Sequence, residues 1–241
     1  LVTPEMVGRR KALTLLKVLL VNAGRPVPCD TLQAILWPGA APALAAGRLH
    51  VVVHALRRVL DASVVRRTPD AYRLDVGDAC WVDVRAFGAA VAAGRRAERS
   101  GAIAEAIGAY ETAADLYRGD LLEGEPDADW CSLEREHLRE LLLDVLTALA
   151  GLHAREGDLD RAIACCRRAL RVDPIREEIH RRLVEALWRA GRRDEALRQY
   201  RTCREILRQE LGVAPLPETE RLAERVRAGP APRDGGRRVE T

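Results

Sequence analysis

Apolar residues recur every three or four positions through residues 9–24, the first stretch of the chain that is long enough to form an element. This spacing places the apolar side chains on one face of an α-helix. The positions concerned are Leu13, Leu16, Leu19 and Leu20. Gly24 follows as a stop signal, so the pattern predicts one amphipathic helix that ends before this glycine.

The same period continues in VPCDTLQAILWP, residues 27–38. The apolar face of this second helix consists of Leu32, Ile35 and Leu36. We expect Asp30 to cap its N-terminus and Gln33, three residues later, to complete a capping box. Pro38 ends the helix, because proline lacks a backbone N–H and its ring clashes with the preceding turn.

A third helix is predicted over GRLHVVVHALRRVL, residues 47–60, after a loop at PGAAPALAAG, residues 38–47. One arc of its helical wheel is entirely aliphatic and is expected to be buried. That arc holds Leu49, Val52, Val53, Leu56 and Leu60. The opposite side is mildly basic and holds Gly47, Val51, His54, Ala55 and Arg58, flanked by Arg48, His50 and Arg57.

The next stretch, VVRRTPDAYRLDV, predicts two short strands around a Pro-Asp turn. Two helices, a loop, a helix with basic outer positions and a hairpin form the order of a winged helix-turn-helix. In that arrangement the third helix enters the major groove of DNA, and the hairpin, called the wing, lies against the backbone. Arg66, Arg67 and Arg73 stand where a wing would use arginines.

From Val84 onward the apolar period predicts helices throughout. Beyond Gly157 the chain repeats with a period of 34, which is typical of the paired helices of tetratricopeptide repeats. The matching pairs are Gly157 and Gly191, Asp160 and Asp194, Ala162 and Ala196, and Leu149 and Leu183. The stripes around the Gly191 turn predict helix-pair contacts at Leu183, Leu187, Trp188, Ala196, Leu197 and Tyr200.

Two further signals mark the ends of helices in this second half. Asp173 followed by Pro174 predicts a helix start, with Asp173 as N-cap and Pro174 at the first helical position. APLPETERLAERVRAG predicts a last helix. We therefore expect a mainly α protein: a winged helix-turn-helix at residues 1–80, an all-α tetratricopeptide-like array at 81–228, and a disordered tail at 229–241.

Composition narrows the class of protein. A chain of 241 residues with 48% hydrophobic and 31% charged residues is typical of globular proteins. No apolar run is long enough to span a bilayer and no cleavable signal is visible, so we expect a cytoplasmic protein with no membrane partner. The six cysteines show no C-x-x-C spacing, which favours reduced, packed thiols.

The net charge of +3 is unevenly distributed. Residues 1–87 hold 12 Lys and Arg against 7 Asp and Glu, a balance of +5, whereas the remainder holds 27 against 29, a balance of −2. This division favours an anion-binding module joined to a neutral one. Only Lys11 and Lys17 are lysines, and together with the many alanines this indicates a high-GC bacterial source.

The outer side of the third helix leaves several alternatives open. His50 and His54, four residues apart, could provide two metal ligands, but a third ligand at local spacing is missing. A membrane-surface helix would carry an aromatic anchor, and this helix has none. A plain core helix with a solvated face remains an alternative to a DNA-reading helix.

The residues resemble a known family in both halves of the chain. DTLQAILWP, GRLHVVVHALRRVLD and RRTPDAYRLD are similar to the second helix, recognition helix and wing of OmpR-type winged helices. WVDVRAFGAAV, LYRGDLLEGEPDADWCSLEREHLRE and the run from DPIREEIHRR to ELGVAP resemble the bacterial transcriptional activator domain. This pairing is typical of the Streptomyces antibiotic regulatory protein (SARP) family of transcriptional activators, and the resemblance covers residues 9–227.

This chain departs from the family pattern in three places. Only LVTPEMVG precedes the first helix, so the N-terminal sheet of the family is expected to be incomplete here and the chain to be a piece of a longer protein. Ala71 stands before Tyr72, where the family usually has a glycine. Ala55 replaces an arginine that recognition helices of this type tend to carry.

We predict a DNA-binding transcriptional activator without catalytic residues, cofactor or metal. Arg57 and Arg58 are expected to meet phosphates, Arg48 a phosphate or a guanine edge, and Val51 a thymine methyl, while His50 and His54 donate hydrogen bonds at the groove. The resemblance implies self-association, with a homodimer on tandem sites as one option. It also implies contacts between the helical domain and RNA polymerase, near which the segment WPGAAPALAAG would lie.

The alternative function is a protein-interaction adaptor. In that case the tetratricopeptide-like helices would do the work, and the winged helix would be a packing unit with little affinity for DNA. Ala55 and the modest net charge favour it. DNA binding by the front domain distinguishes the two functions.

Overall fold

The structure is a computed structural model that describes residues 10–22, 24–60, 63–75, 77, 81–125 and 129–230. The chain divides into two compact units. The first holds the described residues of Leu1–Ala86 together with those of Gly124–Leu133. The second holds Phe87–Glu123 and the described residues from Glu134 onward.

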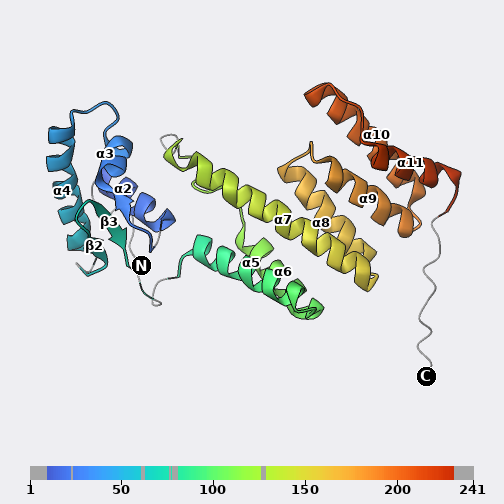
Figure 1. Ribbon diagram of the computed structural model, residues 1–241, viewed down its shortest axis with the longest axis horizontal. Coiled ribbons are helices and arrows are strands. Elements are labelled where there is room, and N and C mark those ends of the chain that lie inside the picture. Colours follow the sequence, from blue (N-terminus) through green and yellow to red (C-terminus); the bar gives the residue numbers. More distant parts are fainter. Residues whose placement is uncertain are drawn as a thin grey trace. The chain divides into compact units, whose positions relative to one another are not determined.

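The first unit contains a winged helix-turn-helix (Figure 1). Its elements are α2 (Arg10–Val21), β1 (Val27–Pro28), α3 (Cys29–Leu36), α4 (Pro42–Val59), β2 (Val65–Arg67) and β3 (Ala71–Leu74). The three helices and the hairpin predicted from the apolar period are therefore confirmed. The segment in which an incomplete N-terminal sheet was expected, residues 1–8, lies outside the described residues.

A small antiparallel sheet, with strand order β1-β3-β2, closes this domain. The wing pairs Val65 with Leu74 and Arg66 with Arg73 across β2 and β3. Strand β1, which the sequence analysis did not predict, is only two residues long and pairs Val27 with Tyr72. A strand this short is recognised by its pairing with a neighbour and not by a sequence period.

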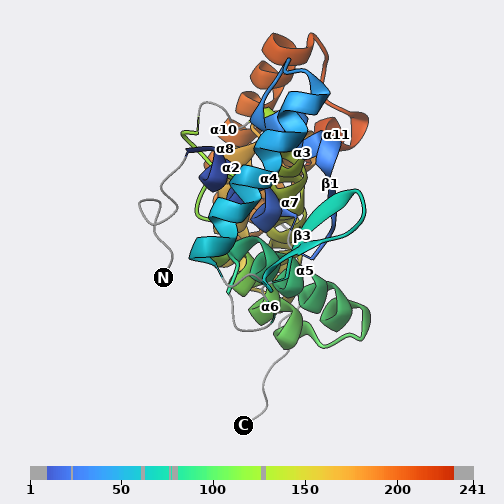
Figure 2. The same cartoon turned by 90° about the vertical axis from the view of Figure 1, so that its left-hand side faces the viewer.

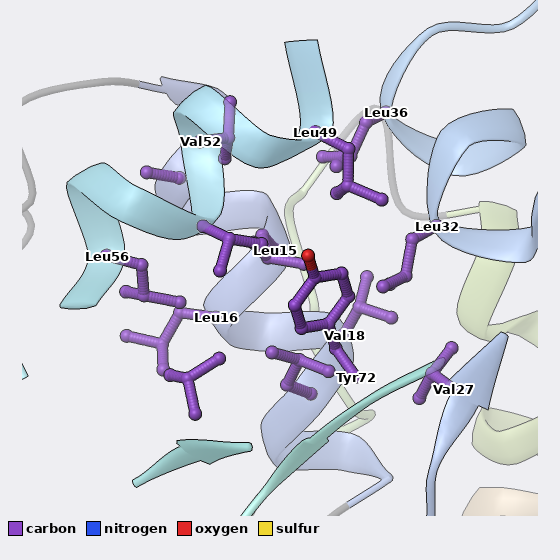
Figure 3. Packing of buried hydrophobic residues seen from close by; sticks show 14 of the residues in the cluster. Leu15, Leu16, Val18, Val27, Leu32, Leu36, Leu49, Val52, Leu56 and Tyr72 are labelled. Carbon is purple, nitrogen blue, oxygen red and sulfur yellow. The ribbon is translucent and has the colours of Figure 1, made fainter. Parts of the chain in front are cut away.

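The core of the winged helix is one aliphatic cluster around Tyr72 (Figure 3). The buried leucines of α2 and α3 meet the aliphatic arc of α4, and the wing contributes Val65 and Leu74. On α4, Leu49, Val52, Val53 and Leu56 are buried as predicted, while Leu60 is half-buried after the end of the helix. Burial of one arc fixes which side of α4 remains open to solvent.

The predicted capping box of α3 is wrong. Pro28 occupies the N-cap position, no side chain caps the helix, and Asp30 lies within the first turn. The backbone N–H of Cys29 donates instead to the carbonyl oxygen of Asp70 in the wing turn, at 2.8 Å. The start of α3 is thus fixed by the neighbouring hairpin, while Asp30 still complements the positive end of the helix dipole.

The predicted start of the third helix is also wrong, because α4 begins at Pro42 and not at Gly47. Ala41 is extended and serves as N-cap, and Pro42 follows at the first helical position, where its missing N–H costs nothing. Ala45 is buried, so the added turns pack against the core. The connection that the sequence analysis placed at residues 38–47 is therefore shortened to Pro38–Ala41.

The segment before α7 also belongs to the first unit. Trp130 packs against the aliphatic cluster of the winged helix. The ammonium group of Lys17 on α2 lies 2.5 Å from a carboxylate oxygen of Glu125. The sequence analysis assigned these residues to the helical array by their position along the chain.

The second unit is an array of helices (Figure 1). Helix α5 (Asp83–Arg99) enters it, and the others are α6 (Ile103–Leu116), α7 (Ser132–Glu156), α8 (Leu159–Val172), α9 (Glu177–Arg189), α10 (Arg193–Ile206) and α11 (Pro217–Ala228). A short 3₁₀ turn η1 (Asp129–Cys131), which belongs to the first unit, precedes α7, and a π-helical turn η2 (Leu207–Leu211) extends α10 in the second unit. The all-α array expected from the sequence is confirmed.

The period of 34 corresponds to helix pairs that repeat. Gly157 and Gly191 end α7 and α9 with positive φ angles of 83° and 76°, a backbone region that favours glycine. Ala162 and Ala196 are both buried, as small residues at close helix contacts should be. The predicted contact residues Leu183, Leu187, Trp188, Ala196 and Tyr200 are buried, and Leu197 is half-buried.

Asp173 and Pro174 do not start α9 as predicted. Asp173 is the C-cap of α8, and its carboxylate accepts hydrogen bonds from the backbone N–H of Ile175 at 3.1 Å and from Nε of Arg176 at 2.6 Å. The two residues form a turn, and α9 begins at Glu177. Local capping chemistry is present, but it stabilises the turn instead of the helix.

Three other predictions concern parts of the chain that the structure describes only partly. Five cysteines there are free thiols, whereas Cys80 lies outside it. The predicted tail at 229–241 is described only at Gly229 and Pro230. Among the described helices, none is both long and apolar enough to cross a bilayer.

Candidate nucleic-acid interface

The outer face of α4 consists of Leu44, Gly47, Arg48, Val51, His54, Ala55 and Arg58. All of these residues are exposed except Ala55, which is half-buried. Leu44 and Val51 have 61% and 54% of their surface open to solvent, which is high for large aliphatic side chains. The outer face runs from Leu44 to Arg58, and these two residues are about 21 Å apart along the axis at the rise of an α-helix. Figure 2 shows α4 from a second side.

Arg48 and Arg58 are free cations on this face. Neither side chain has an ion-pair or hydrogen-bond partner among the residues that the structure describes, and both are exposed. Arginine carries five N–H donors in a planar fork, and these fit a phosphate or the O6 and N7 atoms of guanine. The two arginines therefore keep their donors open for an anion.

His50 lies at the edge of α4 and is joined to the wing. Its Nδ1 lies 3.2 Å from the hydroxyl group of Tyr72 on β3, and the ring of Tyr72 fills the centre of the core. The contact leaves one ring nitrogen, Nε2, without a partner among the described residues. His54 lies one turn further on the outer face and is exposed.

Arg57 is engaged inside the domain. Its Nε and Nη2 both donate to the carbonyl oxygen of Val65 on β2, at 3.1 and 2.6 Å, and the side chain is half-buried. The sequence predicts that Arg57 meets phosphates together with Arg58. In the structure Arg57 has an intramolecular role instead, since it ties the wing to α4.

The three arginines of the wing have different surroundings. Arg66 and Arg73 face each other across the hairpin, and both lie near the carboxylate of Asp75, at 3.3 and 3.4 Å. Nε of Arg73 is buried without a hydrogen-bond partner. Arg67 has no ion pair in the described part of the chain, and its guanidinium group lies 6.0 Å from the ring centroid of Tyr72. Arg67 is thus the wing cation with the least compensated charge.

Most of this surface is predicted by the sequence, but Leu44 is not. The predicted helix begins at Gly47, so Leu44 falls in the predicted loop before it. The signal that could have found it is Ala41-Pro42, since proline at the first helical position often opens a helix. With the helix extended, Leu44, Arg48 and Val51 occupy successive turns of one face.

The winged helix also contains two histidines, His50 and His54, and one thiol, that of Cys29. Within the described residues, no three His, Cys, Asp or Glu side chains form a cluster that could hold a metal. Burial raises the pKa of the Cys29 thiol, with Arg67 opposing the effect, so this thiol stays protonated and is a poor nucleophile at neutral pH. The groups on the outer face of α4 that are available to a ligand are cationic side chains and exposed methyl groups.

Comparison with known proteins identifies both halves of the chain. Residues 82–227 match the family described as the bacterial transcriptional activator domain. The chain is 30% identical over 225 residues to the transcriptional regulatory protein MoaR1 of Mycobacterium tuberculosis, covering 91% of this chain and 72% of MoaR1. It is 28% identical over 225 residues to the regulatory protein AfsR of Streptomyces coelicolor, covering 93% of this chain but only 23% of AfsR.

A solved structure agrees with these matches. Mycobacterium tuberculosis EmbR, in complex with a low-affinity phosphopeptide, superimposes with a TM-score of 0.81 at 28% identity. The superposition covers 94% of this chain and 61% of the EmbR chain. The match to the activator domain extends over more than half of the chain. The chain therefore belongs to the bacterial transcriptional activator domain family, and its resemblance to the SARP regulators is confirmed.

Proposed function

We propose that this chain is a transcriptional regulator that binds double-stranded DNA with the outer face of α4 and with the β2–β3 wing. It activates genes of a biosynthetic or metabolic pathway and acts in the cytoplasm, without a catalytic site or cofactor. One observation carries the proposal: α4 buries one complete arc in the core of a winged helix and presents Arg48, Val51 and Arg58 to solvent on the other.

The polar and apolar side chains of α4 and of the wing have different proposed roles. Arg58 and the wing residue Arg67 neutralise phosphates, and Arg66 and Arg73 do so more weakly because Asp75 lies between them. Arg48 meets a phosphate or a guanine edge, and Val51 contacts a thymine methyl. His54, together with Nε2 of His50, provides hydrogen bonds at the groove. Arg57 acts as a positioning residue for the wing.

The helical array supplies the protein contacts of the regulator. Its proposed partners are components of RNA polymerase and a second copy of the chain bound to a tandem site. Two domains held on one duplex raise the effective concentration of the second binding event, so a direct repeat is bound more tightly than one half-site. The names of MoaR1 and AfsR, which are called regulatory proteins, support the proposed role as a regulator.

A salt titration tests DNA binding. Fluorescence anisotropy of labelled duplexes, measured at several salt concentrations, should give a logarithmic affinity that falls linearly with the logarithm of salt. Arg58→Ala and Arg67→Ala should each weaken binding to all sequences and reduce the slope by about one unit. Salt-independent binding, or no binding to any duplex, would overturn the proposal.

The second candidate function is a protein-interaction adaptor. Two observations favour it: Ala55 offers no hydrogen bond on the outer face, and Asp75 partly neutralises the wing. In that case the array would bind its partner with unchanged affinity when Arg48 and Arg58 are replaced by alanine. Comparing duplex binding with partner binding in that double variant separates the two functions.

A further inference from the structure

A groove in the helical array has the composition of a ligand site. It has a volume of about 390 Å³ and is lined by residues of α5, α6, α7 and α9 and by Arg176 just before α9. Pockets of about 300–1,000 Å³ are the usual size for bound ligands. All residues that line the groove belong to the second unit and are described.

Four arginines stand around this groove, together with three carboxylates. Arg95 pairs with Asp144 at 2.9 Å, Arg182 pairs with Glu178 at 2.8 Å, and the hydroxyl of Tyr110 donates to Glu98 at 2.9 Å. The carboxylates of the lining therefore already have partners.

The arginines around the groove differ in how many of their N–H donors already have a partner. Arg176 binds Glu140 and Asp173, which are not part of the lining. Arg155, in the last turn of α7, is exposed and has no ion pair or hydrogen bond within the described residues. Nε and Nη2 of Arg182 are used by Glu178, which leaves the donors of Nη1 open. The open donors thus belong to two arginines from different helices.

The floor between these two arginines is made of small residues of α7. Thr147 and Ala148 line the groove, and Gly151 lies one turn after them on the same side of α7. Nη1 of Arg182 lies over Gly151, 3.4 Å from the position that a Cβ atom would take there. Because Arg155 follows Gly151 by four residues, it lies on the same face of α7. Arg155 and Arg182 therefore both line this part of the groove, and the guanidinium group of Arg182 covers Gly151.

We propose that this groove binds an acidic peptide segment of a partner protein, with one carboxylate held by Arg155 and Arg182. The peptide lies along Thr147 and Ala148, and its carboxylate reaches the guanidinium group of Arg182 above Gly151. Charge complementarity selects an acidic peptide, because the N–H donors without a partner in the described part of the chain belong to the guanidinium groups of Arg155 and Arg182. The proposal rests on the role of the array in protein contacts and not on DNA binding.

The composition of the groove argues against two other occupants. Sites for small molecules are mostly lined by apolar and aromatic side chains, whereas half of the residues that line this groove are charged. Duplex DNA requires a continuous row of cations, but Glu98, Asp144 and Glu178 interrupt the basic rim. A peptide with isolated carboxylates fits the alternation of charges better than either.

Peptide binding by the full chain tests the proposal. The probe is a short fluorescein-labelled peptide in which Asp and Glu alternate with Ala and Leu, and its neutral counterpart carries Asn and Gln. We expect saturable binding of the acidic peptide alone, which weakens as salt increases. Arg155→Glu should weaken it about tenfold, because a charge-assisted hydrogen bond is replaced by repulsion. Arg155→Lys should retain part of the affinity.

Arg171→Glu is the matched control, since Arg171 is an exposed arginine in the last turn of α8 and does not line the groove. It should leave peptide binding unchanged, as should Arg58→Ala, which tests the DNA interface separately. Equal binding of the neutral peptide, or an equal effect of both charge reversals, would overturn the proposal. The proposal would also be overturned if Arg155→Glu weakened the binding of a DNA duplex and Arg171→Glu did not. In that case the groove would bind nucleic acid.

Discussion

The guanidinium group of Arg57 donates two hydrogen bonds to one carbonyl oxygen of Val65, from Nε at 3.1 Å and from Nη2 at 2.6 Å. Arg57 lies in the last turn of α4, and Val65 begins the first strand of the wing. This contact joins α4 to the wing. On the same helix, His50 makes a second such link through the hydroxyl of Tyr72, at 3.2 Å.

Replacing Arg57 should therefore affect stability more than the electrostatics of DNA binding. Arg57→Ala should lower the free energy of unfolding by about 1–3 kcal/mol, because a buried carbonyl loses charged donors. The salt slope of duplex binding should stay unchanged, since no phosphate contact is removed. Urea unfolding and a salt titration measure the two effects. Arg58 is the adjacent, exposed arginine, and Arg58→Ala should leave the free energy of unfolding nearly unchanged but reduce the salt slope of duplex binding. A reduced slope for Arg57→Ala would contradict the positioning role of Arg57.

Gly94 on α5 is expected to be sensitive to one added methyl group. A Cβ atom there would lie 2.5 Å from two ring carbons of Tyr110 on α6, so the two helices would have to separate. Gly94→Ala should lower the free energy of unfolding by about 1–3 kcal/mol.

Gly88 provides a control on the same helix, because a Cβ there meets nothing within 4 Å. Gly88→Ala should stabilise the protein by up to about 1 kcal/mol through the better helix propensity of alanine. Thermal or urea unfolding compares the two variants. Equal effects would show that α5 and α6 do not pack closely at Gly94.

Leu187 on α9 should be essential for packing in the array, since only 1% of its surface is exposed. Leu187→Ala should cost about 2–5 kcal/mol, because it removes buried methyl groups and leaves a cavity. Leu211, with 54% of its surface exposed, is the control, and Leu211→Ala should change stability by less than about 0.5 kcal/mol. A thermal shift near zero for Leu187→Ala would show that the assigned apolar stripe is wrong.

His180 should make the array less stable in mild acid. Its Nε2 donates to the carbonyl of Pro174 at 2.8 Å, and its Nδ1 lies 2.6 Å from the amide nitrogen of Gln199. Burial lowers the pKa of His180 below 6.5, while the bond to Pro174 opposes this effect. The unfolded chain therefore takes up a proton at higher pH than the folded chain, and stability is lost as the pH falls below about 6.5.

The pH effect can be measured by urea unfolding at pH values between about 7 and 5. His180→Gln should reduce the loss of stability over this range, whatever its effect at pH 7. His137→Gln, at an exposed position of α7, should leave the loss unchanged. An imidazole pKa of His180 above 6.5 by NMR would contradict the prediction.

Much of the fold followed from the period of apolar residues. The aliphatic arc of α4 and the stripes of α9 and α10 were predicted because a long amphipathic helix repeats its signal over several turns. The glycines at 157 and 191 marked helix ends because few other residues adopt their positive φ angles. Local signals were weaker guides, as the wrong caps at Asp30 and Asp173 show.

The sequence by itself determined the order of the elements, the buried arc of α4 and the family to which the chain belongs, because these depend on residue type and spacing alone. Only the tertiary structure decided which arginines remain available to a ligand. Arg57 and Arg58 are neighbours in the sequence, yet one binds a carbonyl of β2 and the other faces solvent. The groove with Arg155 and Arg182 could not be predicted from the sequence, because it is lined by residues of α5, α6, α7 and α9. No local period records which side chains of helices far apart in the sequence will meet.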